Sequence, residues 1–317
     1  MMRVRPLGSG DDDAWDRFCA DACNATFLHT RRFLSYHGDR FVDRSLVVED
    51  DRGWLAVLPA AQDPADPAVV VSHPGITYGG FVHQGTLRGE RAVEALALAA
   101  RHYTGLGLRT LRYKALPHIY QRAPAQDDLY ALFRAGARRW RCDLSCCIDL
   151  AHRLLVSERR RRGVSKAMRA GVRLADGIVY AAALWPVLED NLMRRHGVRP
   201  VHTLQELETL ADRFREQIRF HVALVDDQVI AGVVLFACGT VVHAQYIAAS
   251  EQGHALSALD AVFEAAIADA AQQSARWFDF GISTEDHGWR LNEGLYRFKS
   301  EFGGGGVVHE FYEIDLA

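Results

Sequence analysis

The chain has 317 residues, of which 49% are hydrophobic and 24% charged, and this is the composition of an ordinary globular protein. Its formal net charge of −3 is too small for bulk attraction to nucleic acid, so any phosphate-binding site has to be local. No apolar run approaches the ~18 residues of a membrane span, and the first residues turn acidic where a signal peptide is apolar. We therefore expect a cytoplasmic protein without a membrane span.

The six cysteines do not form a CxxC motif, and no histidine accompanies them at zinc-finger spacing. Cys142 and Cys146 alternate with apolar positions on a strand-like run, which is typical of small buried side chains. We expect reduced thiols, no metal site and no tightly bound cofactor.

Hydrophobic periodicity predicts the elements of the first half in chain order. The predicted helices cover residues 15–22, 30–37, 87–103 and 129–137. The predicted strands cover residues 45–49, 54–59, 69–72, 108–114 and 141–150. Between the first two strands, Asp50-Asp51-Arg52-Gly53 is a hairpin signal.

The second half repeats this order. The predicted helices cover residues 158–170, 186–196, 204–214, 255–273 and 291–299. The predicted strands lie near residue 178 and over residues 219–225, 229–237, 241–248, 276–281 and 307–316. Asp226-Asp227-Gln228 stands in the second hairpin.

Local similarity supports a duplication. LVVEDDRGWLAVLPA in the first half aligns with VALVDDQVIAGVVLF in the second, and both halves end in Ile-Asp-Leu, at 148–150 and 314–316. Each half then reads β-α-α-β-β-β-α-β-α-β. We predict an α/β (α+β) protein of two tandem domains, 1–152 and 153–317, each a mixed, mostly antiparallel sheet flanked by helices.

The stretch LNEGLYRFKSEFGG carries the most informative side chains. Asn292, Tyr296 and Lys299 are four and three residues apart, so on a helix they share one face. The glycines from Gly303 onward end that helix. A phenol and an ammonium on one face can do acid or phosphate-binding chemistry. The alternative is that Tyr296 packs and Lys299 is solvated.

The segment Asn292-Glu-Gly-Leu-Tyr-Arg-Phe-Lys-Ser-Glu-Phe-Gly, after the fifth strand of its half, is similar to the Asn…Leu-Tyr…Gly-Phe helix of GNAT acyltransferases. Two such halves in one chain resemble the FemAB/FemX-like aminoacyltransferases, whose arginine-rich helix also looks like SKAMRAGV here. The resemblance implies a tandem GNAT fold and an N-acyltransferase, with Phe298-Lys299 at the donor site.

The donor loop departs from the GNAT pattern. Enzymes of this type that bind acetyl-CoA carry (Gln/Arg)-x-x-Gly-x-(Gly/Ala) after the fourth strand, where backbone amides hold the pyrophosphate. Here Gly253 and Ala255 fit, with His254 between them, but Ser250 and Glu251 replace the expected donors. This change favours aminoacyl-tRNA, and acyl-CoA and aminoacyl-tRNA both remain possible co-substrates.

Acyl transfer to an amine needs a polarised carbonyl, a deprotonated amine and a protonated leaving group. The strand residues Gln245 and Tyr246 are expected beside the donor carbonyl, in the run that begins at His243. Tyr296 can protonate the leaving group and Lys299 can neutralise developing charge. His243 and Asp279 are as well explained as structural residues, so the sequence identifies no general base.

In the first half, the loop equivalent to the donor loop contains His73, Tyr78, Gly79 and Gly80. Its glycines let a ligand approach the backbone, and we predict an acceptor site here, in a cleft between the domains. The alternative is a tight turn with a packed tyrosine.

Arg159, Arg162 and Lys166 lie in the basic helix of the second half. We predict that they bind phosphate, from a tRNA backbone or a nucleotide-linked acceptor, although a solvated face explains them equally.

The sequence thus predicts an N-acyltransferase. Its donor is acyl-CoA or aminoacyl-tRNA, and its acceptor is an amine on a cell-envelope precursor, an amino sugar or a small metabolite. The alternative function is a non-catalytic tandem-GNAT module that binds a ligand or a partner protein. The oligomeric state stays open.

Overall fold

The computed structural model describes residues 1–316, which form two compact units. The first unit comprises Met1–Leu144, Thr284–Arg290 and the segment that starts at Val308. The second unit comprises Ser145–Ser283 and Leu291–Val307. The chain therefore leaves the first unit and returns to it at the end.

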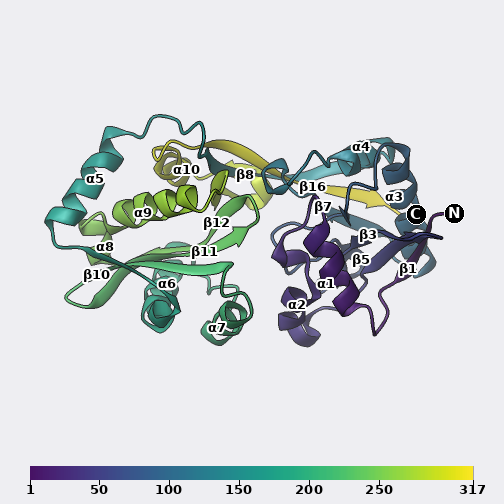
Figure 1. The fold of residues 1–317 in the computed structure, drawn as a ribbon, viewed down its shortest axis with the longest axis horizontal. Helices are drawn as coiled ribbons and strands as arrows, with labels where there is room; N and C mark the ends of the chain where they lie inside the picture. Colours follow the sequence, from purple (N-terminus) through teal and green to yellow (C-terminus); the bar gives the residue numbers. More distant parts are fainter. Residues whose placement is uncertain (317) are drawn as a thin grey trace. The chain divides into compact units, whose positions relative to one another are not determined.

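The first unit is built from two sheets and four α-helices (Figure 1). Its helices are α1 (Asp12–Asp21), α2 (Arg31–Leu34), α3 (Glu90–Gly105) and α4 (Asp127–Arg134). Its strands are β1 (Arg3–Pro6), β2 (Leu46–Asp50), β3 (Gly53–Leu58), β4 (Ala61–Asp63), β5 (Asp66–Val71), β6 (Val82–His83), β7 (Thr110–Lys114) and the first part of β8 (Arg138–Asp149). One sheet has the order β1-β2-β3-β6, and β4, β5 and β7 belong to the other. The apolar stripe of α3, with Ala95, Ala99 and Tyr103 fully buried, packs into the main core.

The second unit has a single mixed sheet in the order β8-β13-β12-β11-β10-β9. Its strands after β8 are β9 (Arg173–Asp176), β10 (Ile218–Val225), β11 (Gln228–Cys238), β12 (Val241–Ala249) and β13 (Trp277–Ile282). Its helices are α5 (Glu158–Arg169), α6 (Ala181–His196), α7 (Leu204–Arg213), α8 (Glu251–Ala255), α9 (Ala258–Gln272) and α10 (Glu293–Ser300). In Figure 1, α9 covers one face of this sheet and α6 the other, so the strands are buried on both sides.

The predicted elements occur in the predicted order in both halves. The additions are β1, β4 and β6 in the first half, and α8, β14 (Thr284–Glu285) and β15 (Arg290–Leu291) in the second. Two local predictions were wrong. The strand expected near residue 178 is β9, and Ile178–Tyr180 is a 3-10 helix. The helix expected to start at Pro186 starts at Ala181. Proline is common in the first turn of a helix, but Pro186 lies inside this one.

The closing strands are exchanged relative to the expectation. The strand predicted to end the second half, β16 (Gly305–Asp315), pairs with β7 of the first unit, with Phe311 opposite Lys114. The strand predicted to end the first half, β8, pairs with β13 of the second unit, with Asp149 opposite Trp277. The division between the units consequently falls at Leu144 and Ser145, earlier than the predicted 152/153, and the last strand belongs to the first unit.

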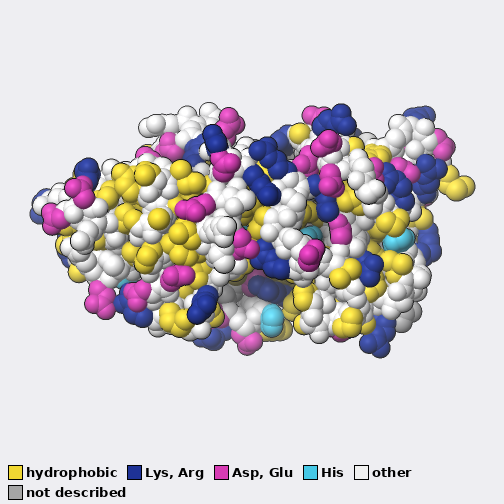
Figure 2. All heavy atoms as spheres, turned by 90° about the horizontal axis from the view of Figure 1, so that it is seen from below, with side chains coloured by type: hydrophobic (Ala, Val, Ile, Leu, Met, Phe, Trp, Pro, Cys, Tyr) yellow, Lys and Arg dark blue, Asp and Glu magenta, His cyan; other side chains and the backbone are white. Residues whose placement is uncertain are grey.

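Hydrophobic side chains gather on the face of the second unit that carries α6 and α7 (Figure 2). The exposed apolar residues of this stretch of the chain are Ile178, Val179, Met193, Val198 and Val201. None of the helices within residues 1–316 has the length and apolar character to cross a membrane.

Candidate active site

The site starts where two parallel strands stop pairing. β12 and β13 are paired from Val241 and Trp277 to His243 and Asp279. Beyond this point β12 continues to Ala249, whereas β13 keeps its antiparallel pairing with β8, where Ile282 lies opposite Ser145. His243 and Asp279 are therefore the last residues of the parallel ladder.

These two residues form a hydrogen-bonded pair. The His243 Nδ1 and Asp279 Oδ2 atoms are 2.9 Å apart, and Asp279 is fully buried while the His243 side chain is 12% exposed. An ionised carboxylate only accepts, so with Asp279 ionised His243 Nδ1–H is the donor of this pair. The sequence did not predict this pair, because the residues are far apart in the chain and only the strand register brings them together.

Asp279 is held by donors from three other residues. Its Oδ1 atom accepts from the Ser145 hydroxyl, from the Cys147 thiol at 3.2 Å and from the Gly281 N–H at 2.9 Å. Several donors to one buried carboxylate favour its ionised form and fix its orientation. A fixed, ionised Asp279 is suited to orient His243 and to stabilise it as imidazolium.

Lys299 is the third group, and the alternative of a solvated side chain is wrong. Lys299 is 3% exposed and donates to the carbonyl oxygens of Gly281 at 2.8 Å and Ile282 at 2.7 Å. Burial lowers its pKa from 10.5 to about 8, although the nearby Asp279 acts in the opposite direction. Lys299 is thus a buried cation that still titrates close to neutral pH.

Gly281 links the histidine pair to the lysine. Its N–H donates to Asp279 and its carbonyl accepts from Lys299. Its φ of +77° is a left-handed conformation that other residues adopt only with strain. A Cβ at this position would make only an ordinary contact, 3.4 Å from the His243 ring, so the positive φ is the reason for glycine. This backbone conformation lets one residue contact both Asp279 and Lys299.

The remaining residues predicted on α10 have different roles. Asn292 is the N-cap, since its side-chain oxygen accepts from the Leu295 N–H at 3.1 Å, and it does not lie on the helix. Tyr296 is half-buried and packs against the core of the second unit. Burial raises its pKa, so its phenol stays protonated at neutral pH. Phe298, predicted at the donor site, is half-buried, whereas Phe302 is fully buried.

Ser283 adds an unsatisfied donor to this segment. It is 1% exposed, and its hydroxyl has no hydrogen-bond partner among residues 1–316. It directly follows Ile282, the second carbonyl that Lys299 contacts. A buried hydroxyl without a partner is costly, so it is a candidate contact for a bound substrate.

The predicted donor loop is a short helix, α8. Ser250 is its N-cap: its hydroxyl accepts from the Gly253 N–H at 3.1 Å and donates to the Ile230 carbonyl at 3.1 Å. Gly253 is buried, and a Cβ there would lie 2.3 Å from the Ile230 carbonyl oxygen. Packing against β11 therefore accounts for this glycine. Glu251 is exposed and forms an ion pair with Arg194 at 3.1 Å.

The other residues predicted to bind the donor differ in how exposed their side chains are. His254 and Ala255 are exposed, and Gln245 is half-buried. Tyr246 is 8% exposed and its hydroxyl lies 2.5 Å from His202 Nδ1. Burial raises its pKa to about 12. Its hydroxyl is engaged with His202, and we find packing the simpler account of its position.

Sequence reasoning also missed a buried ion-pair network beside α10. Arg160 is 5% exposed and forms ion pairs with Asp260 and with Glu301, the latter at 3.0 Å. Its guanidinium lies 4.8 Å from the centre of the Phe298 ring. The predicted phosphate ligands Arg159, Arg162 and Lys166 are instead exposed on the same helix. The four-arginine run hides which member is buried, and only the packing of α5 against α9 shows it.

The loop predicted for the acceptor is in the first unit and is tightly packed. Tyr78 is 2% exposed and donates to the Thr26 hydroxyl at 3.3 Å. A Cβ at Gly79 would lie 1.9 Å from the Ser72 carbonyl oxygen, and Gly80 has a φ of +83°. Internal packing therefore explains both glycines without a ligand. His73 is buried, which lowers its pKa to about 2, with neighbouring cations adding to the shift.

Lys114 gives this loop a half-buried cation of its own. It donates to the carbonyls of His73, at 3.3 Å, and Ile76. Desolvation lowers its pKa to about 7. The chain has only three lysines, and two of them, the half-buried Lys114 and the buried Lys299, each donate to two loop carbonyls.

Comparison with known proteins supports the predicted fold. Residues 153–299 match the family model described as an acetyltransferase (GNAT) domain. No curated protein sequence matches the chain. The fold of the whole chain is that of tandem GNAT proteins, as the likeness to the three solved structures below shows.

The crystal structure of FemX superimposes with a TM-score of 0.69 at 11% identity, over 99% of this chain and 97% of that one. The structure of L-PGS from Bacillus licheniformis gives a TM-score of 0.63 at 13% identity, over 97% of this chain and 93% of that one. A tandem GNAT protein from the clavulanic acid biosynthesis pathway gives 0.55 at 14% identity, over 100% and 99%. These identities establish a shared fold only.

Proposed function

We propose that the protein is an N-acyltransferase that moves an acyl or aminoacyl group from an activated donor to an amine. The observation that carries this proposal is the meeting of His243, Asp279 and Lys299 around Gly281, at the end of the parallel ladder. The match of residues 153–299 to a GNAT domain gives the reaction type, and the site supplies the groups that the reaction needs.

The reaction begins when the neutral acceptor amine attacks the donor carbonyl carbon. Nε2 of His243 removes a proton from the amine nitrogen as the nitrogen becomes positively charged. Asp279 stabilises the imidazolium that forms, as a buried carboxylate does for a catalytic histidine. The new C–N bond forms and the C–O bond of an ester, or the C–S bond of a thioester, breaks when the tetrahedral intermediate collapses.

Two groups stabilise the negative charge that develops in this step. The Lys299 ammonium neutralises negative charge that develops on the donor, and Tyr296 gives its proton to the departing oxygen or sulfur. Solvent returns the proton from His243 to the phenolate. The buried hydroxyl of Ser283 is a further donor to the intermediate, because it has no partner of its own among the described residues.

Aminoacyl-tRNA is the donor that the loop favours over acyl-CoA. The N–H of Gly253 is taken by Ser250 Oγ, and those of His254 and Leu256 donate to backbone carbonyls within the same loop. These three amides are therefore not available to cradle a pyrophosphate. The exposed carboxylate of Glu251 at the same end also disfavours a phosphate.

The acceptor is an amine on a cell-envelope precursor, an amino sugar or a small metabolite. The loop of His73 and Tyr78, with the half-buried Lys114, is kept as a proposed binding site for such a molecule in the first unit. The packed geometry of that loop requires that a ligand contact its outer surface, because its glycines are filled by Ser72 and Tyr113.

Thermal shift with candidate donors tests the proposal. A ligand at ~100 times its dissociation constant stabilises the folded protein by about 2.7 kcal/mol, which is easily measured. We expect charged tRNA to raise the melting temperature more than the same tRNA without its amino acid, and acetyl-CoA to leave it unchanged. Stabilisation by acetyl-CoA alone would overturn the donor assignment. No response to any donor would favour the non-catalytic alternative.

A further inference from the structure

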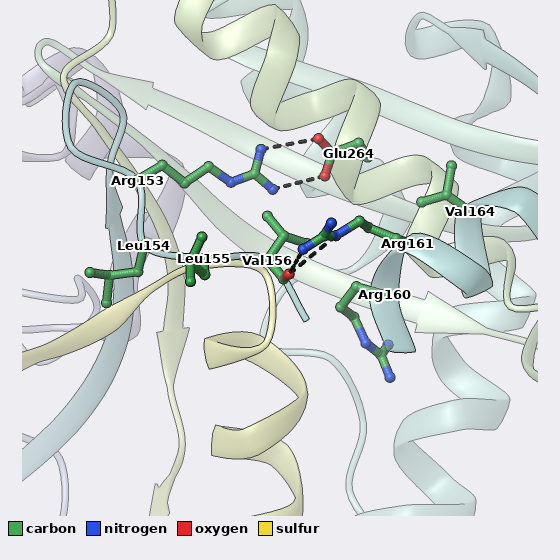
Figure 3. Close-up of a pocket in the computed structure, with 8 residues that line it drawn as sticks. All are labelled: Arg153, Leu154, Leu155, Val156, Arg160, Arg161, Val164 and Glu264. Carbon is green, nitrogen blue, oxygen red and sulfur yellow. Dashed lines mark hydrogen bonds and ion pairs between the residues drawn. The ribbon is translucent and has the colours of Figure 1, made fainter. Parts of the chain in front are cut away.

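The segment that leads into α5 presents two leucines to solvent. Leu154 is 61% exposed and Leu155 is 93% exposed. Adjacent leucines with this exposure are unusual on a chain that has enough interior to bury them, and they require an explanation. Figure 3 shows them side by side on the segment before α5, next to Val156.

The backbone of this segment is fixed. The Leu154 N–H donates to the Gly303 carbonyl at 3.1 Å, and the Ser157 N–H donates to the Glu301 carbonyl at 2.9 Å. Arg153 adds a bidentate ion pair to Glu264, at 3.0 and 2.8 Å (Figure 3). Gly303 is required here, because a Cβ on it would lie 2.3 Å from the Leu154 carbonyl oxygen. The leucines are therefore held outward by the fold and do not project from a loose loop.

A hollow lies beside the leucines. A cavity of ≈ 470 Å³ is lined by Arg153, Leu154, Leu155, Val156, Arg160, Arg161, Val164 and Glu264. Half of these side chains are aliphatic, and Arg161 reaches back to the Val156 carbonyl at 2.8 Å at its edge (Figure 3). The exposed apolar surface is thus continuous with an apolar hollow of small-ligand size.

The helix that follows is strongly basic. Residues 158–169 contain six basic side chains and one acidic side chain, in a protein whose net charge is −3. Arg160 is neutralised in the interior by Asp260 and Glu301, but Arg159, Arg161, Arg162, Lys166 and Arg169 are exposed. Exposed cations next to exposed aliphatic side chains complement a surface that is anionic and has an apolar layer beneath its charges.

We propose that residues 154–169 form a docking surface for a bilayer of anionic lipids. Leu154 and Leu155 enter the boundary between headgroups and acyl chains, while the exposed cations of α5 contact lipid phosphates. Residues 151–177 contain no Phe, Trp or Tyr, so the surface lacks the large aromatic stacking platform that single-stranded RNA uses. The docking surface is separate from the acyl-transfer site proposed above, and the proposal of membrane docking does not depend on that activity.

Vesicle sedimentation of the full chain tests the proposal. We expect binding to vesicles of phosphatidylglycerol and phosphatidylcholine in equal parts, little binding to pure phosphatidylcholine, and a loss of binding at 1 M salt. The Leu154→Ser/Leu155→Ser variant should bind about tenfold more weakly or worse. The Arg159→Glu/Arg162→Glu/Lys166→Glu variant should bind about a hundredfold more weakly, because each surface cation contributes separately.

Two matched variants control for apolar loss and for net charge. Leu106→Ser/Val201→Ser removes exposed apolar side chains elsewhere, and Arg101→Glu/Arg109→Glu/Arg199→Glu makes the same charge change on other exposed residues. Both should bind the mixed vesicles as the wild type does. All altered side chains are exposed, and unchanged melting temperatures verify that each variant is folded.

Three results would overturn the proposal. One is equal binding to both kinds of vesicle, or none to either. Another is that the control variant Arg101→Glu/Arg109→Glu/Arg199→Glu loses as much vesicle binding as the α5 variant. The loss of binding would then be explained by the net charge of the protein. The last is that the wild type binds tRNA and the Arg159→Glu/Arg162→Glu/Lys166→Glu variant does not, while this variant still binds vesicles as the wild type does. This result would make the surface an RNA-binding surface.

Discussion

Replacing Lys299 by methionine should change how stability depends on pH. Lys299 is 3% exposed, and burial lowers its pKa from 10.5 to about 8. Between pH 8 and 10.5 the unfolded chain still binds a proton that folded Lys299 has lost. The free energy of unfolding therefore rises with pH in this window, and the rise is absent without the lysine.

The size of the effect follows from the pKa difference. The shift from 10.5 to about 8 corresponds to about 3 kcal/mol, of which about 2 kcal/mol appears between pH 7 and pH 9.5. Lys114 contributes a rise of the same sign, because burial lowers its pKa to about 7. That contribution is common to wild type and variant and cancels in their difference.

Urea unfolding at pH 7, 8.3 and 9.5 measures this difference. Relative to Lys299→Met, the wild type should gain about 2 kcal/mol across the series. The control is Lys166→Met, which removes the only exposed lysine of the chain and should run parallel to the wild type. Parallel curves for wild type and Lys299→Met would refute the assignment of a lowered pKa to Lys299, and with it the account of the site's charge.

Three further predictions concern packing and the donor. Arg160→Met should destabilise by about 3–5 kcal/mol in urea unfolding, because the buried Asp260 and the half-buried Glu301 are left without their cation. The exposed Arg159→Met should change stability by less than about 0.5 kcal/mol. Phe302→Ala should cost about 3–5 kcal/mol and the half-buried Phe298→Ala clearly less, so a reversed order would contradict the core assignment. Isothermal titration should show weak or absent acetyl-CoA binding, and micromolar affinity that is unaffected by Glu251→Gln would show that the interpretation of the loop is wrong.

The order of elements could be predicted because periodicity is a local property. Helices and strands follow from apolar spacing, and both hairpins follow from their turn residues. Asp226 and Asp227 do adopt positive φ, and Gly53 lies opposite Asp50 across the first hairpin. These signals are contained within a few residues, so no tertiary contact was needed to read them.

Strand partners could not be predicted in the same way. The strand that contains Asp149 and the strand that contains Asp315 carry the same Ile-Asp-Leu ending and similar alternation. By sequence pattern alone, either of these strands is compatible with pairing to β7 or to β13. Pairing depends on register and on the neighbours across the sheet, which a single sequence does not show. The exchange of these two strands is therefore seen only in the three-dimensional structure.

The candidate site shows the same limit at the level of side chains. Helical spacing placed Tyr296 and Lys299 on one helix, but it could not reveal that Gly281 and Ile282 lie over the ammonium and bury it. His243 and Asp279 were visible one at a time, and each had a structural explanation. Their function became arguable only when the register of β12 and β13 placed them 2.9 Å apart.

The most direct test of the account is amide formation with a labelled donor. Radiolabelled aminoacyl-tRNA is incubated with free and nucleotide-linked amino sugars, and label transferred to the amine is counted for wild type, His243→Gln and a control, His118→Gln. We predict transfer by the wild type and the control, and a fall of about 10²–10⁴-fold in His243→Gln, because general-base catalysis contributes on this scale. Full transfer by His243→Gln would contradict the account.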